Sequence, residues 1–291
     1  MASAREPAGG RNGLAPGWRF LLWLGVLLAV LALFALVGGG RLGVVGGVVA
    51  SLLAALTAGW VVLGVQGDPP GALGFGLRPG LLRELLLGTL LGLLLLVPPL
   101  ALLTATDAIR WSADPGGLGA WIGRGGESLA FLSVAAAGEE VLVRGYPLQL
   151  LAESRGAAVA LLVTSVVFAG LHLGNPSVGW IGVVNVAVAG LFLGVLVLRT
   201  GSLWWATGAH LGWNWGQAFL ADLPVSGFDL VDTPGWDASL TGSSWIAGGG
   251  FGLEGSVLST LVLGGAAWAC WRTPRLRPEG PRWWVPAEQE P

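Results

Sequence analysis

Long apolar runs, separated by short glycine-rich or charged turns, make up most of this sequence. The first two cover residues 20–40 and 42–67. A basic lead before an apolar segment is also typical of a signal peptide, whose apolar core has about 7–15 residues. The first run is longer, so we expect an uncleaved membrane helix. In the second run, the spacing Gly43-x-x-x-Gly47 would allow two helices to approach closely.

The same pattern predicts further helices in the rest of the chain. Residues 157–198 carry no charge and are too long for one span, and the segment 174–177 (Gly-Asn-Pro-Ser) divides them into two helices. Polar loops are expected at 107–127 and 222–254. The other helices are predicted at residues 85–106, 128 to about 151, 202–221 and 255–271. Together these runs predict an all-α, polytopic membrane protein with about eight transmembrane helices.

The composition agrees with this class of protein. Of the 291 residues, 54% are hydrophobic and 11% are charged, and the mean hydropathy is +0.72. One membrane domain accounts for this length. The single cysteine, Cys270, excludes an internal disulfide and a cysteine-based metal cluster. The net charge of -2 argues against a nucleic-acid partner and leaves the lipid bilayer as the expected environment.

The arginines are distributed unevenly between the two predicted sides of the membrane. With eight helices, the N-terminal segment, the loop around residues 78–83, Arg155, Arg199 and the C-terminal tail fall on one side. The opposite side has fewer arginines and contains the acidic loop 222–254. The positive-inside rule therefore predicts a multi-pass protein of the cell membrane with both termini in the cytoplasm.

One apolar run differs from the others because it contains three formal charges: Glu139, Glu140 and Arg144. A charged residue at the centre of a membrane helix costs about 2.5–3.5 kcal/mol, so the three would cost roughly 8–10 kcal/mol if they faced lipid. They must therefore face protein or water. Glu140 and Arg144 are four residues apart and share a helix face, which predicts an ion pair. Glu139 lies about 100° round the helix axis and lacks that partner.

The only two histidines of the chain both lie in apolar runs. Phe168 and His172 are four residues apart near the end of the predicted fifth helix. His210 and Asn214 have the same spacing in the middle of the seventh, so they project from one face. A single histidine there could be a satisfied core residue, but an ionisable residue inside a membrane marks a candidate functional site. Two histidines, two adjacent glutamates and an arginine favour one shared site.

The ordered motifs Glu-Glu-x-x-x-Arg, Phe-x-x-x-His and His-x-x-x-Asn, on successive predicted membrane helices, resemble the CAAX protease and bacteriocin-processing family (CPBP, or Abi). Its members are intramembrane glutamic endopeptidases related to the type II CAAX prenyl proteases. The resemblance covers about residues 128–220, which would form the catalytic core of a membrane domain spanning residues 18–271. Residues 1–17 are then expected to be a disordered cytoplasmic N-terminus, and residues 272–291 a cytoplasmic tail.

By position, the resemblance implies that Glu139 is the general base. With His172 it would hold and activate a water for attack on a peptide carbonyl, while His210 and Asn214 would form the oxyanion hole. The residue types suit this chemistry, because a carboxylate in a low-dielectric site can act as a base near neutral pH. Two donors on one helical face can also converge on a developing oxyanion.

The resemblance further implies that Glu140 and Arg144 form a supporting pair. Tyr146 and Gln149, which are polar neighbours of the cluster, are expected to make hydrogen bonds rather than take part in catalysis. The expected partners are the lipid bilayer and a membrane-associated peptide or protein substrate, and no cofactor is expected.

Three alternatives remain open. Two histidines and a glutamate also make a zinc ligand set, and although the histidines lack His-Glu-x-x-His spacing, ligands from separate helices can meet in space. The chain could instead be a non-catalytic scaffold or bacteriocin-immunity relative. As a proton-coupled transporter, it would use Glu139 and the histidines as a proton relay, but no internal repeat of the kind found in many transporters is visible.

The predicted depths of the site residues disagree. Glu139 and His210 fall near the middle of their predicted helices, whereas His172 falls near the outer end of its own. Either the fifth helix begins deeper than expected, or the fourth is broken near Gly145 and Pro147. The sequence leaves both alternatives open.

Overall fold

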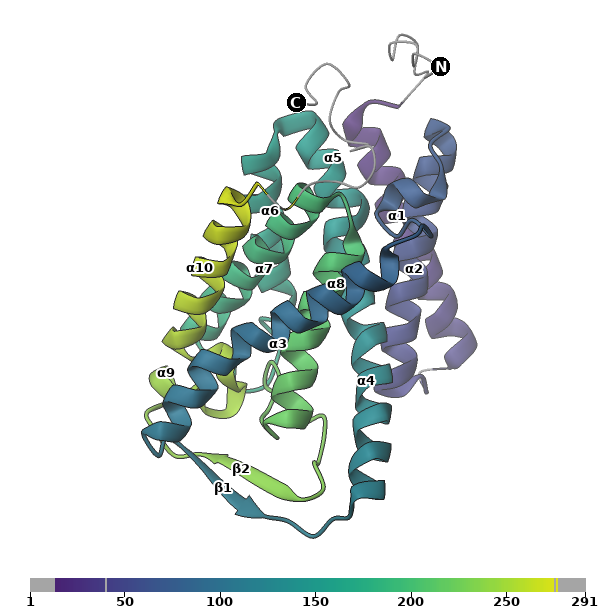
Figure 1. Cartoon of the computed structure of the whole chain (residues 1–291). Coiled ribbons are helices and arrows are strands. Elements are labelled where there is room, and N and C mark those ends of the chain that lie inside the picture. Colours follow the sequence, from purple (N-terminus) through teal and green to yellow (C-terminus); the bar gives the residue numbers. More distant parts are fainter. Residues whose placement is uncertain (1–13, 40, 275, 277–291) are drawn as a thin grey trace.

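The computed structural model describes residues 14–39, 41–274 and 276, and these are mostly helical (Figure 1). The elements are α1 (Pro16–Gly38), α2 (Gly43–Gln66), α3 (Leu81–Ala105), β1 (Ile109–Ala113), α4 (Leu118–Glu140), α5 (Tyr146–Arg155), α6 (Ala157–Leu171), α7 (Trp180–Thr200), α8 (Leu203–Trp215), β2 (Trp236–Leu240), α9 (Ser244–Ala247) and α10 (Val257–Arg272). Short 3₁₀ turns occur at Pro70–Leu73, Gly249–Phe251 and Leu253–Gly255, and π-helical turns at Val141–Gly145 and Gly216–Leu220.

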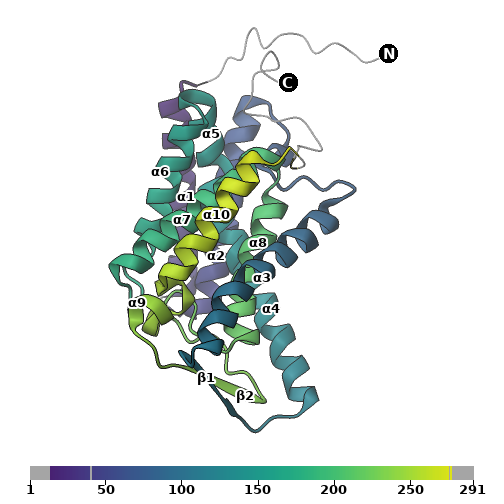
Figure 2. The same cartoon turned by 60° about the vertical axis from the view of Figure 1, so that its left-hand side comes forward.

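Most helices run along one bundle, while α3 crosses it obliquely and the β1–β2 pair lies at one end, the strand end (Figure 1 and Figure 2). At the opposite end, Arg19 near the start of α1 pairs with Glu153 near the end of α5, with 2.6 Å between Nη2 and Oε2. There, Arg199 near the end of α7 donates a hydrogen bond of 2.7 Å to the carbonyl of Thr273, just after α10. The start of α1 and the ends of α5, α7 and α10 therefore lie at the same end of the bundle.

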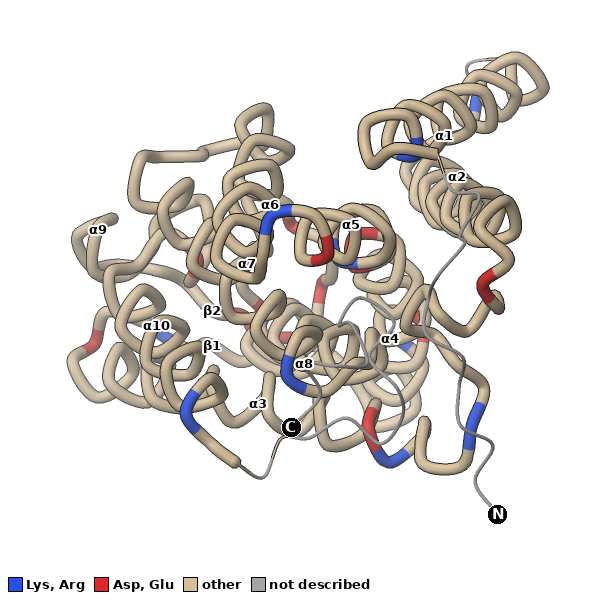
Figure 3. Tube along the Cα trace, turned by 90° about the horizontal axis from the view of Figure 1, so that it is seen from above, with Lys and Arg blue, Asp and Glu red and all other residues tan. Residues whose placement is uncertain are grey.

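Among the described residues, four helices are long and apolar enough to cross a membrane, namely α1, α2, α3 and α7. Charged positions are sparse along the chain when it is viewed from above (Figure 3). A mostly helical, multi-pass membrane protein is thus confirmed, whereas the number of about eight spans stays a prediction. Much of the expected disordered N-terminus and cytoplasmic tail lies outside the described residues.

The chain is not purely α-helical, because the two predicted loops each contribute a strand. β1 and β2 pair antiparallel, with Ile109 opposite Leu240. After β2 the chain turns back and packs against the bundle instead of forming a plain loop. Asn185 of α7 holds this return segment, because its Nδ2 donates hydrogen bonds of 2.7 Å to the carbonyl oxygens of Glu254 and Ser256.

The predicted helix over residues 128–151 is wrong in its bounds. α4 begins at Leu118, inside the predicted loop 107–127, and ends at Glu140. A π-helical turn follows, and α5 then begins at Tyr146. Pro147 has no N–H to donate, so one hydrogen bond of the helical ladder is lost there, and Gly145 departs from helical geometry with a ψ of -114°. The break near Gly145 and Pro147, one of the two alternatives from the sequence, is therefore present.

α3 and α8 approach until their backbones touch, which only glycine allows. A Cβ at Gly92 of α3 would lie 2.1 Å from the carbonyl oxygen of Ala209, and one at Gly212 of α8 would lie 2.1 Å from that of Thr89. Small residues permit such crossings between membrane helices. The crossing fixes the part of α8 that carries His210.

The close approach expected at Gly43-x-x-x-Gly47 is not found. A Cβ at either glycine would have nothing within 4 Å. Gly43 instead has a φ of 58° at the first residue of α2, in the left-handed region that favours glycine. Its role is to turn the chain.

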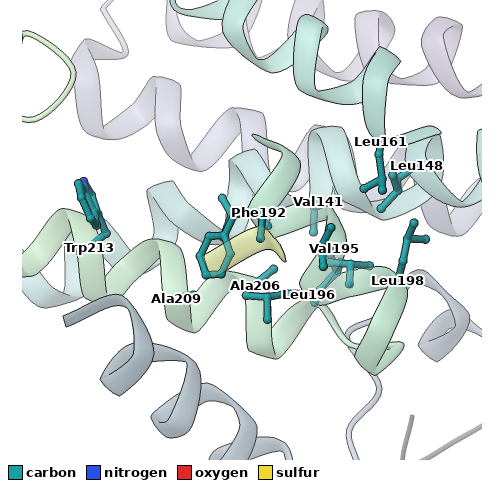
Figure 4. Close-up of a cluster of buried hydrophobic side chains, with 14 of the residues drawn as sticks. Val141, Leu148, Leu161, Phe192, Val195, Leu196, Leu198, Ala206, Ala209 and Trp213 are labelled. Carbon is teal, nitrogen blue, oxygen red and sulfur yellow. The ribbon is translucent and has the colours of Figure 1, made fainter. Parts of the chain in front are cut away.

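α7 is the central helix of the bundle. In its apolar 18-residue window 61% of the residues are buried, compared with 11% in that of α1. Figure 4 shows part of the surrounding core, with Trp213 at one end and Leu148 and Leu161 at the other. Between them lie α7 and α8 side chains, namely Phe192, Val195, Leu196, Ala206 and Ala209, and Leu198 lies near Leu148.

Candidate active site

Glu140 and Arg144 form the buried ion pair expected from their spacing. Glu140 is the last residue of α4, and Arg144 lies in the π-helical turn that follows. Glu140 Oε1 is 3.2 Å from Arg144 Nη1, and both side chains are fully buried. The guanidinium also stacks on the ring of Phe168, 3.9 Å from its centroid. A buried pair needs such additional partners to offset its desolvation.

The same glutamate orients His210. The Nδ1 atom of His210 lies 2.9 Å from Glu140 Oε1. An ionised carboxylate only accepts hydrogen bonds, so Nδ1 carries the proton of this bond. The Nε2 atom of His210 is left facing the neighbouring Glu139. A carboxylate behind a histidine commonly fixes ring orientation in this way.

His172 is oriented by the backbone of its own helix. It follows directly after α6, and its Nδ1 lies 2.8 Å from the carbonyl oxygen of Phe168. A carbonyl can only accept, so Nδ1 is the protonated nitrogen in this bond. The Phe168 ring packs edge-on against the His172 ring, with 4.7 Å between centroids. The spacing Phe-x-x-x-His thus combines a packing contact with a fixed ring orientation.

Both histidines face Glu139. Glu139 Oε2 lies 3.9 Å from Nε2 of His172 and 3.8 Å from Nε2 of His210. These distances are longer than direct hydrogen bonds. The Glu139 side chain is 40% exposed overall, yet its Oε2 atom is buried and has no hydrogen-bond partner among the described residues. Groups from α4, α6 and α8 therefore converge on one carboxylate oxygen.

The length of α6 explains how His172 reaches the level of Glu139. After Glu140, the π-helical turn of five residues and α5 of ten residues lead towards the end of the bundle opposite the strand end. α6 then returns over fifteen residues, so it ends level with its starting point. The apparent disagreement in depth arose because His172 was placed at the outer end of its helix, whereas α6 ends at Leu171, level with Glu139.

A cavity of about 50 Å³ adjoins these groups, which is room enough for ordered water. Its polar lining includes His172, His210, Asn214 and Glu254, and its apolar lining comes largely from α7 and α8. Asn214, one turn after His210, thus faces the same space as both histidines. Three of the four residues assigned to the site by sequence, His172, His210 and Asn214, thus line one small, mostly apolar volume, and Glu139 faces the two histidines.

Glu139, His172 and His210 are not arranged as a closed metal-ligand set. Among the described residues, Asp114, Asp232 and Asp237 at the strand end form the group of three whose donor atoms all lie within 4.8 Å of one another. The zinc set considered from the sequence would require the two imidazoles to move towards each other.

Tyr146 and Gln149 make the hydrogen bonds expected of them. The Tyr146 hydroxyl donates to Gln66 Oε1 over 2.8 Å, and Nε2 of Gln149 donates to the carbonyl of Leu73 over 2.9 Å. Neither side chain lines the cavity described above. Both link α5 to α2 and the turn that follows it.

One residue of the cavity, Glu254, was missed by the sequence analysis, which placed it in an acidic loop. It is only 7% exposed. Gln217, in the π-helical turn after α8, donates a hydrogen bond to its carboxylate. Burial raises the pKa of the Glu254 carboxyl from 4.5 to about 7. One clue to Glu254 is present in the sequence: it is a single charge in a glycine-rich stretch, directly before an apolar run.

The fold and the site together define a helical membrane protein with a buried carboxylate–histidine centre. Residues 126–216 match the family described as type II CAAX prenyl endopeptidase, Rce1-like, and this part of the chain is a domain of that family. The resemblance noted from the motifs is thereby confirmed. The matched range contains Glu139, His172, His210 and Asn214 but not Glu254. No curated protein and no solved structure matches the chain.

Proposed function

We propose that the protein is an intramembrane endopeptidase that hydrolyses a peptide bond of a membrane-associated substrate. Family membership over residues 126–216 supports a CAAX-type protease. The observation that carries the proposal is the convergence of two imidazole Nε2 atoms on the buried, unpartnered Oε2 of Glu139. Such an arrangement suits a water held between polar atoms.

In this mechanism Glu139 acts as the base. A water bound between Glu139 Oε2 and His172 Nε2 attacks the peptide carbonyl carbon while Glu139 accepts its proton. The resulting tetrahedral intermediate collapses as the C–N bond breaks. Glu139 then returns the proton to the leaving amine nitrogen. The products are a new carboxyl terminus and a new amino terminus.

His210 and Asn214 stabilise the oxyanion that forms in the tetrahedral intermediate. Asn214 supplies an amide N–H, and His210 supplies Nε2–H in its doubly protonated form, which pairs with ionised Glu140. Preorganised donors at a developing negative charge are often the largest single contribution to such catalysis. Glu140 and Arg144 act behind His210 and hold its ring in place.

We further propose about eight spans with both termini in the cytoplasm. α1, α2, α3 and α7 supply four, and α4 with α5, α6, α8 with its π-helical turn, and α10 supply the others. The Arg19–Glu153 and Arg199–Thr273 contacts both lie at the end opposite the strand end. Their grouping supports placing the start of α1 and the end of α10 on the same side of the membrane. Reporter fusions after residues 68–78 and at the C-terminus should both read as cytoplasmic, and an exterior signal from either contradicts this topology.

Quantitative proteomics of the membrane fraction tests the peptidase function without a known substrate. Cells that contain the wild-type protein are compared with cells that contain Glu139→Ala at equal abundance. We expect at least one membrane-associated protein to accumulate in its longer, uncleaved form in the variant. Identical terminal peptides in both samples would contradict the proposal. Stoichiometric zinc in the purified wild type, lost in His210→Ala, would favour the metal-dependent alternative.

A further inference from the structure

Glu254 is a buried acidic residue that the mechanism above does not use. It lies in the 3₁₀ turn Leu253–Gly255, outside the family-matched range, and lines the same cavity as His172 and His210. Its Oε2 accepts a hydrogen bond from the side-chain amide of Gln217. A buried carboxyl group beside a catalytic cavity is costly to maintain without a role.

The turn that carries Glu254 is held rigidly. Asn185 binds its carbonyl oxygen and that of Ser256 from α7. A Cβ at Gly252 would lie 1.9 Å from the carbonyl oxygen of Pro224, and one at Gly255 would lie 2.2 Å from that of Gly248. Backbone therefore packs on backbone around this turn. The carboxyl group has a fixed position in the cavity wall, as a binding group requires.

Burial favours the neutral form of Glu254, whereas its hydrogen-bond partners and His210 favour the charged form. Among the described residues no arginine lies within ion-pair distance of its carboxyl group. α7 and α10 pack against the turn, but their arginines, Arg199 and Arg272, lie in the last turns of those helices, at the far end. His210 of α8 is the charged neighbour that acts on it electrostatically. The carboxylate of Glu139 lies beside that histidine.

The position of the proton follows from the hydrogen bonds. Glu254 Oε2 already accepts from Gln217, so a proton is best placed on Oε1. Oε1 is 3.5 Å from the hydroxyl of Ser226, at the limit of a hydrogen bond. Ser226 also lines the cavity. Oε1–H and Ser226 Oγ thus form a short polar edge in a mostly apolar wall.

We propose that Glu254 is a substrate-binding residue of this cavity, which holds a proton and donates it as a hydrogen bond to a carbonyl oxygen of the peptide bound beside Glu139. The inference rests on the peptidase function proposed above. A protonated carboxyl group can donate where a carboxylate would repel the carbonyl oxygen, and apolar sites hold carboxyl groups in this neutral form. Because its pKa is about 7, the donor is lost as the pH rises through neutrality.

Chemical labelling tests the protonated carboxyl group independently of any cleavage. Dicyclohexylcarbodiimide is an apolar reagent that modifies protonated carboxyl groups in apolar sites. In the full-length protein in liposomes, we expect an adduct on Glu254 at pH 6 that falls with a midpoint near pH 7 and is absent from Glu254→Gln. Glu84, buried but paired with Arg78 over 2.7 Å, should stay unmodified at both pH values. No adduct at pH 6, or equal labelling at pH 6 and 8, overturns the inference.

Kinetics on a substrate identified by proteomics test the binding role. Between pH 6 and 8 a group with a pKa of about 7 loses roughly nine-tenths of its protons, so the wild-type KM should rise about tenfold. Glu254→Gln keeps a neutral donor and should retain a low KM at both pH values, whereas Glu254→Ala should have a high KM at both. Asp232→Asn, the same charge change at an exposed position between α8 and β2, should follow the wild type.

These two measurements separate the inference from the proposed function. Labelling of Glu254 without any cleavage by the wild type contradicts the peptidase function and the binding role that rests on it, and leaves only the protonated state of Glu254. Cleavage with no labelling, or with a KM in Glu254→Gln that rises with pH as in the wild type, contradicts the role of Glu254 alone. Equal loss of kcat in the Gln and Ala variants with unchanged KM would mean a structural role and also overturns it.

Discussion

Two clusters of charged residues in this bundle differ in how completely their hydrogen bonds are made. In the first cluster, at the end opposite the strand end, Arg19 donates through Nη1 and Nη2 to both oxygens of Glu153, at 3.2 and 2.6 Å. Its Nε donates to the hydroxyl of Tyr146 over 3.1 Å, and that hydroxyl donates to Gln66. Every nitrogen of this guanidinium has a partner.

In the active-site cluster, by contrast, several buried atoms have no hydrogen-bond partner among the described residues. They are Oε2 of Glu139, Oε2 of Glu140, and Nε and Nη2 of Arg144. Unsatisfied polar atoms in a low-dielectric interior are costly, and they need a specific explanation in a folded protein. The first cluster fastens α1 to α5, whereas the second has unused hydrogen-bonding capacity.

The largest effect on stability is expected from the buried pair of the active-site cluster. Glu140→Gln removes the charge that opposes Arg144 and leaves a fully buried guanidinium uncompensated. Breaking such a pair costs about 3–5 kcal/mol in the free energy of unfolding. Chemical unfolding in detergent measures the loss, and wild-type stability in this variant would remove the structural role of the pair.

Asn214→Ala should affect catalysis rather than folding. Loss of one oxyanion-hole donor typically lowers turnover by about 10²–10³-fold. The loss should appear in kcat with little change in KM, because the bond to the oxyanion forms fully only in the transition state. Asn214→Asp should be at least as damaging, since it adds a negative charge beside the oxyanion. An increase in KM with unchanged kcat would assign Asn214 to ground-state binding instead.

Glu254 should make stability depend on pH. Its folded pKa of about 7 exceeds the unfolded value of 4.5, so the unfolded chain releases this proton first as the pH rises. The free energy of unfolding should therefore fall by about 3 kcal/mol between pH 4.5 and 7 and change little above that. Glu254→Gln should lack this component. Parallel stability profiles of the wild type and the variant would contradict a buried, neutral Glu254.

Glu153→Gln should have the smallest effect, and it is the matched control for Glu140→Gln. The Glu153 side chain is 36% exposed, and ion pairs open to solvent typically contribute about 0–1 kcal/mol. We expect a slightly lowered melting temperature and unchanged kcat. A stability loss as large as that of Glu140→Gln would mean that the two clusters do not differ in the way described.

Hydrophobicity and rare charges made much of this molecule predictable. A charge inside an apolar run must be accommodated by protein or water, so Glu139, Glu140 and Arg144 stood out without any structure. The histidines stood out for the same reason. The spacing of Glu140 and Arg144 on one helix face also predicted their contact, because it depends on local geometry alone.

Features that depend on tertiary packing were not predictable. Which glycines meet is decided by helix crossing, so Gly43 and Gly47 looked as suitable as Gly92 and Gly212. The π-helical turn after Glu140 has no hydrophobic pattern of its own. Glu254 reaches the cavity because a segment of more than thirty residues after α8 folds back onto the bundle. No hydrophobic periodicity in the sequence predicts that this segment folds back onto the bundle.

Glu139 as the catalytic base is tested most directly by the turnover of Glu139→Gln beside that of Glu140→Gln, in liposomes with a substrate identified by proteomics. Glutamine keeps the shape and removes the base, and loss of general-base catalysis typically costs about 10²–10⁴-fold in rate. We predict a loss of at least that size in Glu139→Gln with wild-type thermal stability, because its Oε2 has no hydrogen bond to lose. Turnover that survives in Glu139→Gln, or a stability loss equal to that of Glu140→Gln, would contradict the assignment.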